Sequence, residues 1–158
     1  MTTATQNYGS TTVLTVTNLQ SLADDAFWQS DSIDNVGGVK GFWVEVYITI
    51  VTTTSVGDDN GVINLRMAAS EDDSIFAGRL TGSEGAYSNT LNLDARHTTP
   101  VAGFSCDASE TTARTYRYRA VIHDVPKFFA LLLENKSGEA LASSGNVVEF
   151  AIHKYDST

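Results

Sequence analysis

The sequence is poor in cysteine, proline and basic residues, and each shortage excludes a class of protein. Cys106 is the only cysteine, so no intrachain disulfide and no multi-cysteine metal site can form. Ten Lys and Arg residues stand against 19 Asp and Glu, and the net charge of −9 argues against nucleic acid as a partner. No apolar run approaches the roughly 18 residues that a membrane helix requires, so we expect no membrane partner either.

The first ten residues are polar and lack a basic cluster, an apolar stretch and a small-residue cleavage site. We therefore expect no signal peptide, and synthesis in a cytoplasm. A chain of 158 residues is long enough for one domain with its own core. We expect a loose N-terminal arm over residues 1–11 and a single domain over residues 12–158.

The composition favours an all-β fold. Thr, Val and Ile together account for 40 of the 158 residues, and these β-branched residues suit pleated strands. Both prolines and most glycines lie between periodic segments, where turns are expected. No stretch carries the helical apolar spacing over three turns, although residues 18–28 can hold a short helical turn.

The clearest predicted strand runs from Lys40 to Thr52. Phe42, Val44, Val46, Ile48 and Ile50 alternate with Trp43, Glu45, Tyr47 and Thr49. The first set predicts a core face. The second set mixes aromatic and polar side chains, so we expect that face to be partly covered by a loop, a sheet or another subunit.

Seven further segments have strand-like composition, which gives about eight strands in all. Long polar connections at residues 31–39 and 70–88 favour a Greek-key sandwich or a jelly roll over a meander. We therefore predict an antiparallel, jelly-roll-like β-sandwich. The further strands are predicted at residues 12–17, 61–69, 89–93, 101–106, 113–122, 128–134 and 146–155.

The acidic pairs raise the question of a calcium site. Gly57-Asp58-Asp59-Asn60-Gly61 offers three oxygen-bearing side chains but lacks the alternating ligands and the terminal Glu of a calcium loop. We interpret these acids, together with Asp24-Asp25 and Glu71-Asp72-Asp73, as solvated turn residues. We accordingly predict no metal site and no cofactor.

No pattern predicts catalysis. His97, His123 and His153 lack any spacing that would place two imidazoles on one metal, and we expect surface or cross-strand positions for them. Cys106 has no accompanying oxyanion motif, so we expect a buried or semi-buried thiol. A glycosidase would need two facing carboxylates, whereas the acids here cluster in predicted loops. The sequence therefore predicts a protein that is not an enzyme.

Two surface features remain. On a strand, Arg117 and Arg119 point away from Tyr116 and Tyr118, which predicts an outer basic stripe that pairs with acidic loops of another subunit or with its own neighbours. Trp28, Trp43 and Tyr47 are candidates for a sugar-stacking platform, although core or interface packing is the favoured interpretation for them. The candidate interface residues are therefore Trp43, Tyr47, Arg117 and Arg119.

Four segments, spread over most of the chain, resemble a group of small structural proteins of tailed bacteriophage virions. In that group a turn with Asp-Asn leads into a long alternating strand, a Ser-Glu-Asp loop follows the next strand, and an Asn-x-Ser-Gly…Ser-Gly-Asn turn precedes the last one. The matching segments are residues 27–35, residues 42–50, Ala68-Ala-Ser-Glu-Asp-Asp73, and Leu131-Leu-Leu-Glu-Asn-Lys-Ser-Gly-Glu-Ala-Leu-Ala-Ser-Ser-Gly-Asn-Val147.

The resemblance implies a virion structural protein, made in the host cytoplasm. The expected role is that of a capsid decoration (cement) protein, which binds the outside of the major capsid protein lattice as a homotrimer and stabilises the head. It carries no functional residue over to this sequence. The alternative is a tail-associated or adhesin-type β-sandwich module that binds carbohydrate.

Overall fold

The computed structural model describes residues 4–35, 43–53, 61–77, 80–87, 98–106 and 112–157, with the backbone alone for residues 4–6 and 155–157. Eleven β-strands and one three-residue 3₁₀ helix, η1, occur in this part of the chain. No helix there is long and apolar enough to cross a membrane. In chain order the elements are β1 (Ala4–Asn7), β2 (Thr12–Val13), η1 (Thr17–Leu19), β3 (Phe27–Gln29), β4 (Ile33–Asp34), β5 (Trp43–Val51), β6 (Gly61–Ser70), β7 (Gly85–Tyr87), β8 (Thr99–Cys106), β9 (Thr115–His123), β10 (Phe128–Lys136) and β11 (Val147–Ser157).

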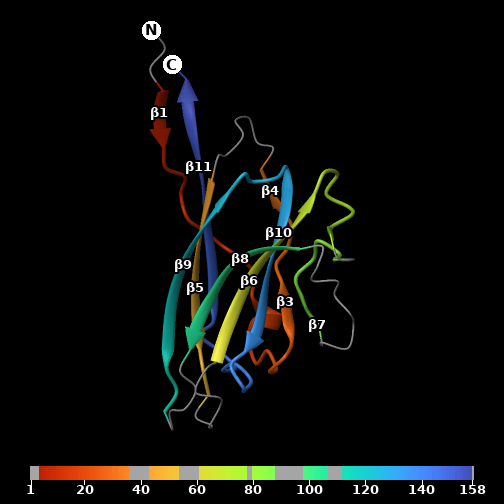
Figure 1. Cartoon of the computed structure of the whole chain (residues 1–158), viewed down its shortest axis with the longest axis vertical. Coiled ribbons are helices and arrows are strands. Elements are labelled where there is room, and N and C mark those ends of the chain that lie inside the picture. The colour runs from red at the N-terminus through yellow and green to blue at the C-terminus, as the bar shows by residue number, and fades with distance from the viewer. Residues whose placement is uncertain are drawn as a thin grey trace.

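The strands form two antiparallel sheets that pack face to face (Figure 1). One has the order β1-β11-β5-β9, with β2 also on β11, and the other has the order β7-β3-β10-β6-β8, with β4 also on β10. Eight strands remain when β1, β4 and β7 are left out. When these eight are renumbered in chain order, one sheet has the order first-eighth-third-sixth and the other has the order second-seventh-fourth-fifth. This is the strand order of a jelly roll, so the predicted all-β, jelly-roll-like β-sandwich is confirmed.

The core lies between the sheets and follows the predicted alternation. On β5, Val44, Val46, Ile48 and Ile50 are buried, while Trp43, Glu45, Tyr47 and Thr49 on the other face are half-buried. The even-numbered residues of β9, with Ala120 and Ile122 buried, also face the core. Lys40 and Phe42, with which the predicted strand begins, lie outside the described residues, as does the strand predicted at residues 89–93.

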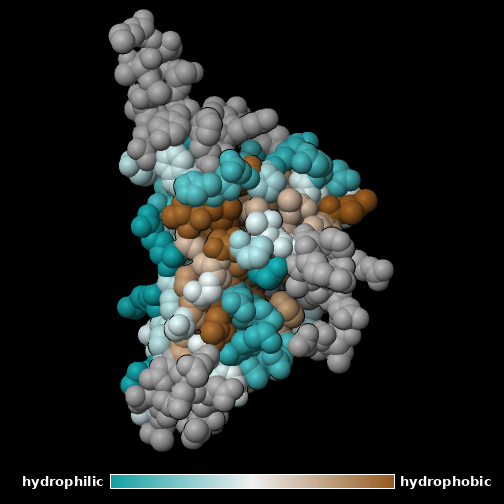
Figure 2. Space-filling view, in the orientation of Figure 1, coloured by the Kyte–Doolittle hydropathy of each residue, from teal (hydrophilic) through white to brown (hydrophobic). Residues whose placement is uncertain are grey.

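The sandwich is closed on one side by aromatic contacts between β8 and β9. The rings of Phe104 and Tyr118 stack at 4.5 Å, and the Tyr118 hydroxyl donates to the Ser105 carbonyl oxygen at 2.8 Å. In Figure 2, hydrophobic residues in the middle of the molecule are interrupted by hydrophilic ones, and the left margin is hydrophilic. Side chains from different sheets therefore hold together two edge strands that share no backbone ladder.

The sequence pattern did not predict the short strands correctly. The segment at residues 18–28 holds only the end of η1 as helix and then forms β3, whose three side chains are all buried. Three residues are too few for an alternation to register. β2 is also shorter than the six residues predicted, because the chain leaves the sheet edge after Leu14, whose amide donates to the Val148 carbonyl oxygen at 2.9 Å, and then turns into η1.

The connection from β6 to β7, predicted to be a polar loop, contributes a second apolar cluster. Phe76 and Leu80 pack against Ala68, Ala130 and Leu132, on the side of the β10–β6 pair that points away from the main core. This loop therefore covers a sheet face that would otherwise expose apolar side chains to water.

Two buried asparagines anchor the turn before β11. Asn135 donates to the carbonyl oxygens of Leu22 and Glu139 at 3.0 and 2.6 Å. Asn146 accepts from the Val51 amide at 2.8 Å and donates to the Ala142 carbonyl oxygen at 2.8 Å. The hydrogen bonds of these two asparagines thus hold the Asn-x-Ser-Gly…Ser-Gly-Asn segment in place. They also give the polar groups buried in this loop the partners that they require.

Candidate interaction face

The face of β9, β5 and β11 that points away from the core, called the outer face here, holds all four sequence-predicted interface residues. The backbone register places Tyr47 between Arg119 on β9 and Glu149 on β11. Two residues along, Thr49 lies between Arg117 and Val147, and at the other end Trp43 lies between His123 and His153. The long alternation of β5 positions these side chains, because each even residue that enters the core leaves its odd neighbours outside.

Glu45 is the centre of a charged cluster on this face. Its carboxylate accepts hydrogen bonds from the Arg119 guanidinium and from the Tyr47 hydroxyl. These two donors, Arg119 first, hold the pKa of Glu45 below its usual value. The same hydrogen bond to Glu45 raises the pKa of Tyr47. The cluster is therefore an anion satisfied by one cation and one hydroxyl.

His153 joins this cluster to the N-terminal segment. Its imidazole is buried, stacks on Trp43 at 5.2 Å and meets the ring of Tyr8 edge-on at 5.5 Å. The Gly9 amide donates to Nδ1 at 3.3 Å. Nε2 has no hydrogen-bond partner and lies 3.8 Å from a carboxylate oxygen of Glu45. Residues 8 and 9 thus cover one end of the outer face.

Most of the exposed large hydrophobic side chains lie on this face. Within the described ranges there are four of them, and Tyr8, Val13 and Val121 belong to the outer face, where they are 68%, 62% and 38% exposed. The fourth, Ile75, is in the loop after β6. Aromatic residues and arginine are the residue types enriched at the centres of protein–protein interfaces.

The sequence predicted some of the residues on this face but not others. Trp43, Tyr47 and Arg119 lie in or beside the Glu45–His153 cluster, whereas Arg117 is exposed and pairs with no described residue. Glu45 was visible as an outer residue of its strand, but nothing in the sequence showed that it would pair with Arg119, 74 positions away. His153 carried no signal beyond its place in a strand.

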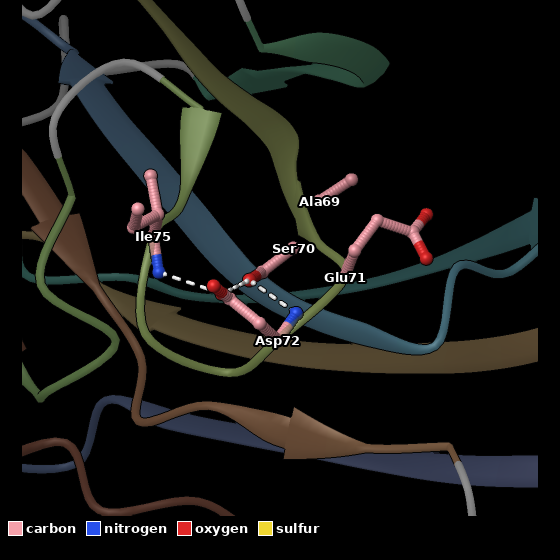
Figure 3. A pocket seen from close by; sticks show the side chains of 5 residues that line it. All are labelled: Ala69, Ser70, Glu71, Asp72 and Ile75. Carbon is pink, nitrogen blue, oxygen red and sulfur yellow. Dashed lines mark hydrogen bonds between the residues drawn. The ribbon is translucent and has the colours of Figure 1, made fainter.

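The acidic loop after β6 borders a shallow pocket of about 290 Å³ lined by Ala69, Ser70, Glu71, Asp72 and Ile75 (Figure 3). The backbone amides of Ser74 and Ile75 both donate to Asp72 at 3.0 Å and lower its pKa to about 2. Ser32 donates to Asp73. Asp72 therefore holds its own turn together, and Asp73 connects that turn to the segment between β3 and β4.

No metal site is evident in the part of the chain that the structure describes, where no three His, Cys, Asp or Glu side chains are grouped closely enough to bind an ion. Asp58, Asp59 and His97 lie outside that part. His123 is exposed at the end of β9, and Cys106 is buried at the end of β8, as expected for the thiol.

Trp28 packs in the core, which confirms the favoured interpretation and excludes the sugar-stacking alternative for this residue. Its side chain is completely buried, and its indole Nε1 donates to Glu84 at 2.8 Å. A ring that packs in the core cannot present a face to a pyranose. Trp43 and Tyr47 stay on the outer face, where Trp43 stacks on His153 and Tyr47 binds Glu45.

Comparisons with known proteins assign no family. No family model matches the chain, and no curated protein matches it. Among solved structures, a chain in the structure of infectious bursal disease virus Gt strain is similar at 10% identity and a TM-score of 0.17. The alignment covers all of this chain and 40% of the viral chain. A likeness of that size carries no argument about function.

Proposed function

We propose that this protein is a virion structural protein, a capsid decoration (cement) protein that binds the outer surface of the major capsid protein lattice and stabilises the head. The observation that carries the proposal is the outer face. It concentrates aromatic, aliphatic and arginine side chains on an otherwise acidic molecule with a net charge of −9. Such a face suits assembly with other proteins.

The fold is compatible with this role. Jelly rolls occur in viral capsid and lectin domains, an association that by itself leaves the function open. The lectin alternative is the weaker one, because Trp28 is in the core. The proposed role is structural and needs neither a catalytic residue nor a cofactor.

In the proposed mechanism, subunits associate through the outer face, and the N-terminal segment and loops contact the capsid protein. β1 and the end of β11 lie side by side at the top of Figure 1, beyond the ends of β5 and β9. This position leaves the N-terminal strand at one extremity of the molecule. Several weak contacts made by one oligomer act together, so retention on the shell does not require a single strong site.

Co-expression with the major capsid protein of the virus that encodes the chain tests this role. We expect the chain to sediment with assembled shells and to raise their melting temperature. A chain shortened to residues 12–158 should bind the shells more weakly, provided that circular dichroism shows it to be folded. A full-length chain that stays in the supernatant would contradict the decoration role. Antibody labelling of tails instead of heads would favour the tail-associated alternative.

A further inference from the structure

We propose that the outer face binds the outer face of a second copy of this chain around a two-fold axis that runs along β5. This dimer forms in the isolated protein, whether or not the chain binds a capsid, and so it goes beyond the proposed function. It differs from the three-fold association that the sequence resemblance implied.

Two charges on the outer face lack partners. Arg117 on β9 is exposed and Glu149 on β11 is half-buried, and neither forms an ion pair or a hydrogen bond with any described residue. They lie on opposite sides of β5: Glu149 is the neighbour of Tyr47, and Arg117 is the neighbour of Thr49. A positive and a negative charge therefore flank one central strand.

A two-fold axis along β5 makes this arrangement self-complementary. Rotation by half a turn about that axis exchanges the positions of β9 and β11, so the arginine side of one copy faces the Glu149 side of the other. Every contact away from the axis occurs twice, as symmetry requires of an isologous interface. Glu149 of the second copy then lies opposite Arg119, with Arg117 two residues away, a spacing of about 7 Å that a long guanidinium side chain can bridge.

The residues at the centre of the outer face are also compatible with this two-fold axis. Tyr47 lies on β5 and therefore meets Tyr47 of the second copy, and Val121 on β9 adds exposed apolar area. Glu45 is already neutralised by Arg119 and Tyr47, so covering it leaves no uncompensated charge.

Charge reversal tests the proposal. Light scattering and sedimentation over a concentration series should give the wild-type chain twice its 17.0 kDa mass. Arg117→Glu and Glu149→Arg should each raise the dimer Kd about 100-fold, because each reversal alters two symmetric ion pairs and about tenfold is expected for each. The double variant, with both charges exchanged, should restore the dimer. Lys127→Glu removes an exposed cation before β10 and should leave the mass unchanged.

Three results would overturn the two-fold contact: a monomeric wild-type chain, a mass of three chains, or charge reversals that change nothing or fail to rescue each other. Circular dichroism of each variant confirms that it is folded. Sedimentation with capsid shells is scored separately. A dimer that does not bind shells contradicts only the proposed function, and a monomer that does bind them contradicts only the two-fold contact.

Discussion

Arg119 donates a hydrogen bond to the carboxylate of Glu45 across the β5–β9 ladder, although the backbone register pairs Arg119 with Tyr47 and Glu45 with Val121. The ion pair is therefore diagonal, and Tyr47 donates to the same carboxylate. Diagonal pairs of this kind lie within reach of long side chains on one sheet face. The contact locks three outer-face side chains into one arrangement.

Glu45→Gln should lower the free energy of unfolding by an amount that depends on pH. The pKa of Glu45 is lowered in the folded protein, so the ionised group stabilises the fold above its ordinary value of 4.5. This contribution is lost as the pH falls through the lower folded value. Urea unfolding should show the variant less stable than wild type at pH 7, with the difference shrinking towards pH 3. A difference that is constant across this range would contradict the assignment, and Glu71→Gln serves as the exposed-acid control.

Asp72→Ala should loosen the turn after β6. Asp72 accepts from the amides of Ser74 and Ile75, and its pKa of about 2 lies below the ordinary 3.8. Its contribution is therefore present above pH 3.8 and is lost as the pH falls through about 2. Hydrogen exchange of the Ser74 and Ile75 amides at pH 6 should become faster in the variant, because both amides lose their acceptor. Unchanged exchange would show that other contacts hold the turn.

Trp28→Phe should destabilise the fold by about 1–3 kcal/mol, because it shrinks a fully buried side chain and removes the donor to Glu84. Urea unfolding measures this loss. Tyr8→Phe changes an aromatic residue that is 68% exposed and should stay within about 0.5 kcal/mol of wild type. Equal effects of the two substitutions would contradict the core position of Trp28.

Gly9→Ala should detach the N-terminal segment from His153. A Cβ at residue 9 would lie 2.1 Å from the Ile152 carbonyl oxygen, so the backbone must shift and the Gly9–His153 hydrogen bond must break. Amides of residues 4–13 should then exchange about fivefold faster or more, the factor expected for one lost hydrogen bond. Ser10→Ala, at an exposed position, is the control. Equal exchange in both variants would mean that the pairing of β1 and β2 with β11 holds the segment without the Gly9–His153 hydrogen bond.

The predicted arm over residues 1–11 is only partly described by the structure. Ala4–Asn7 pairs with β11, with partners from Ser157 at one end to Lys154 at the other. The flexibility of the arm remains a prediction, and hydrogen exchange over residues 4–13 measures it directly. Its contact with a capsid protein likewise remains part of the proposed function.

The residue pattern alone was enough to predict the fold class and the two faces of the long strands. Val44 to Ile50 on β5 and Tyr116 to Ile122 on β9 alternate so regularly that the inner and outer sides follow from local geometry alone. The four candidate interface residues were placed on the outer face by the same argument.

The order of the strands in each sheet, and the presence of the short strands, depend on tertiary contacts. β3 and β7 have three residues each, too few for a pattern, and they exist because β10 and β3 offer them ladder partners. The Glu45–Arg119 pair and the position of Gly9 against His153 join residues 74 and 144 positions apart. Such contacts depend on which distant strands pair within one sheet and in which register, and a single sequence carries no local signal for that pairing.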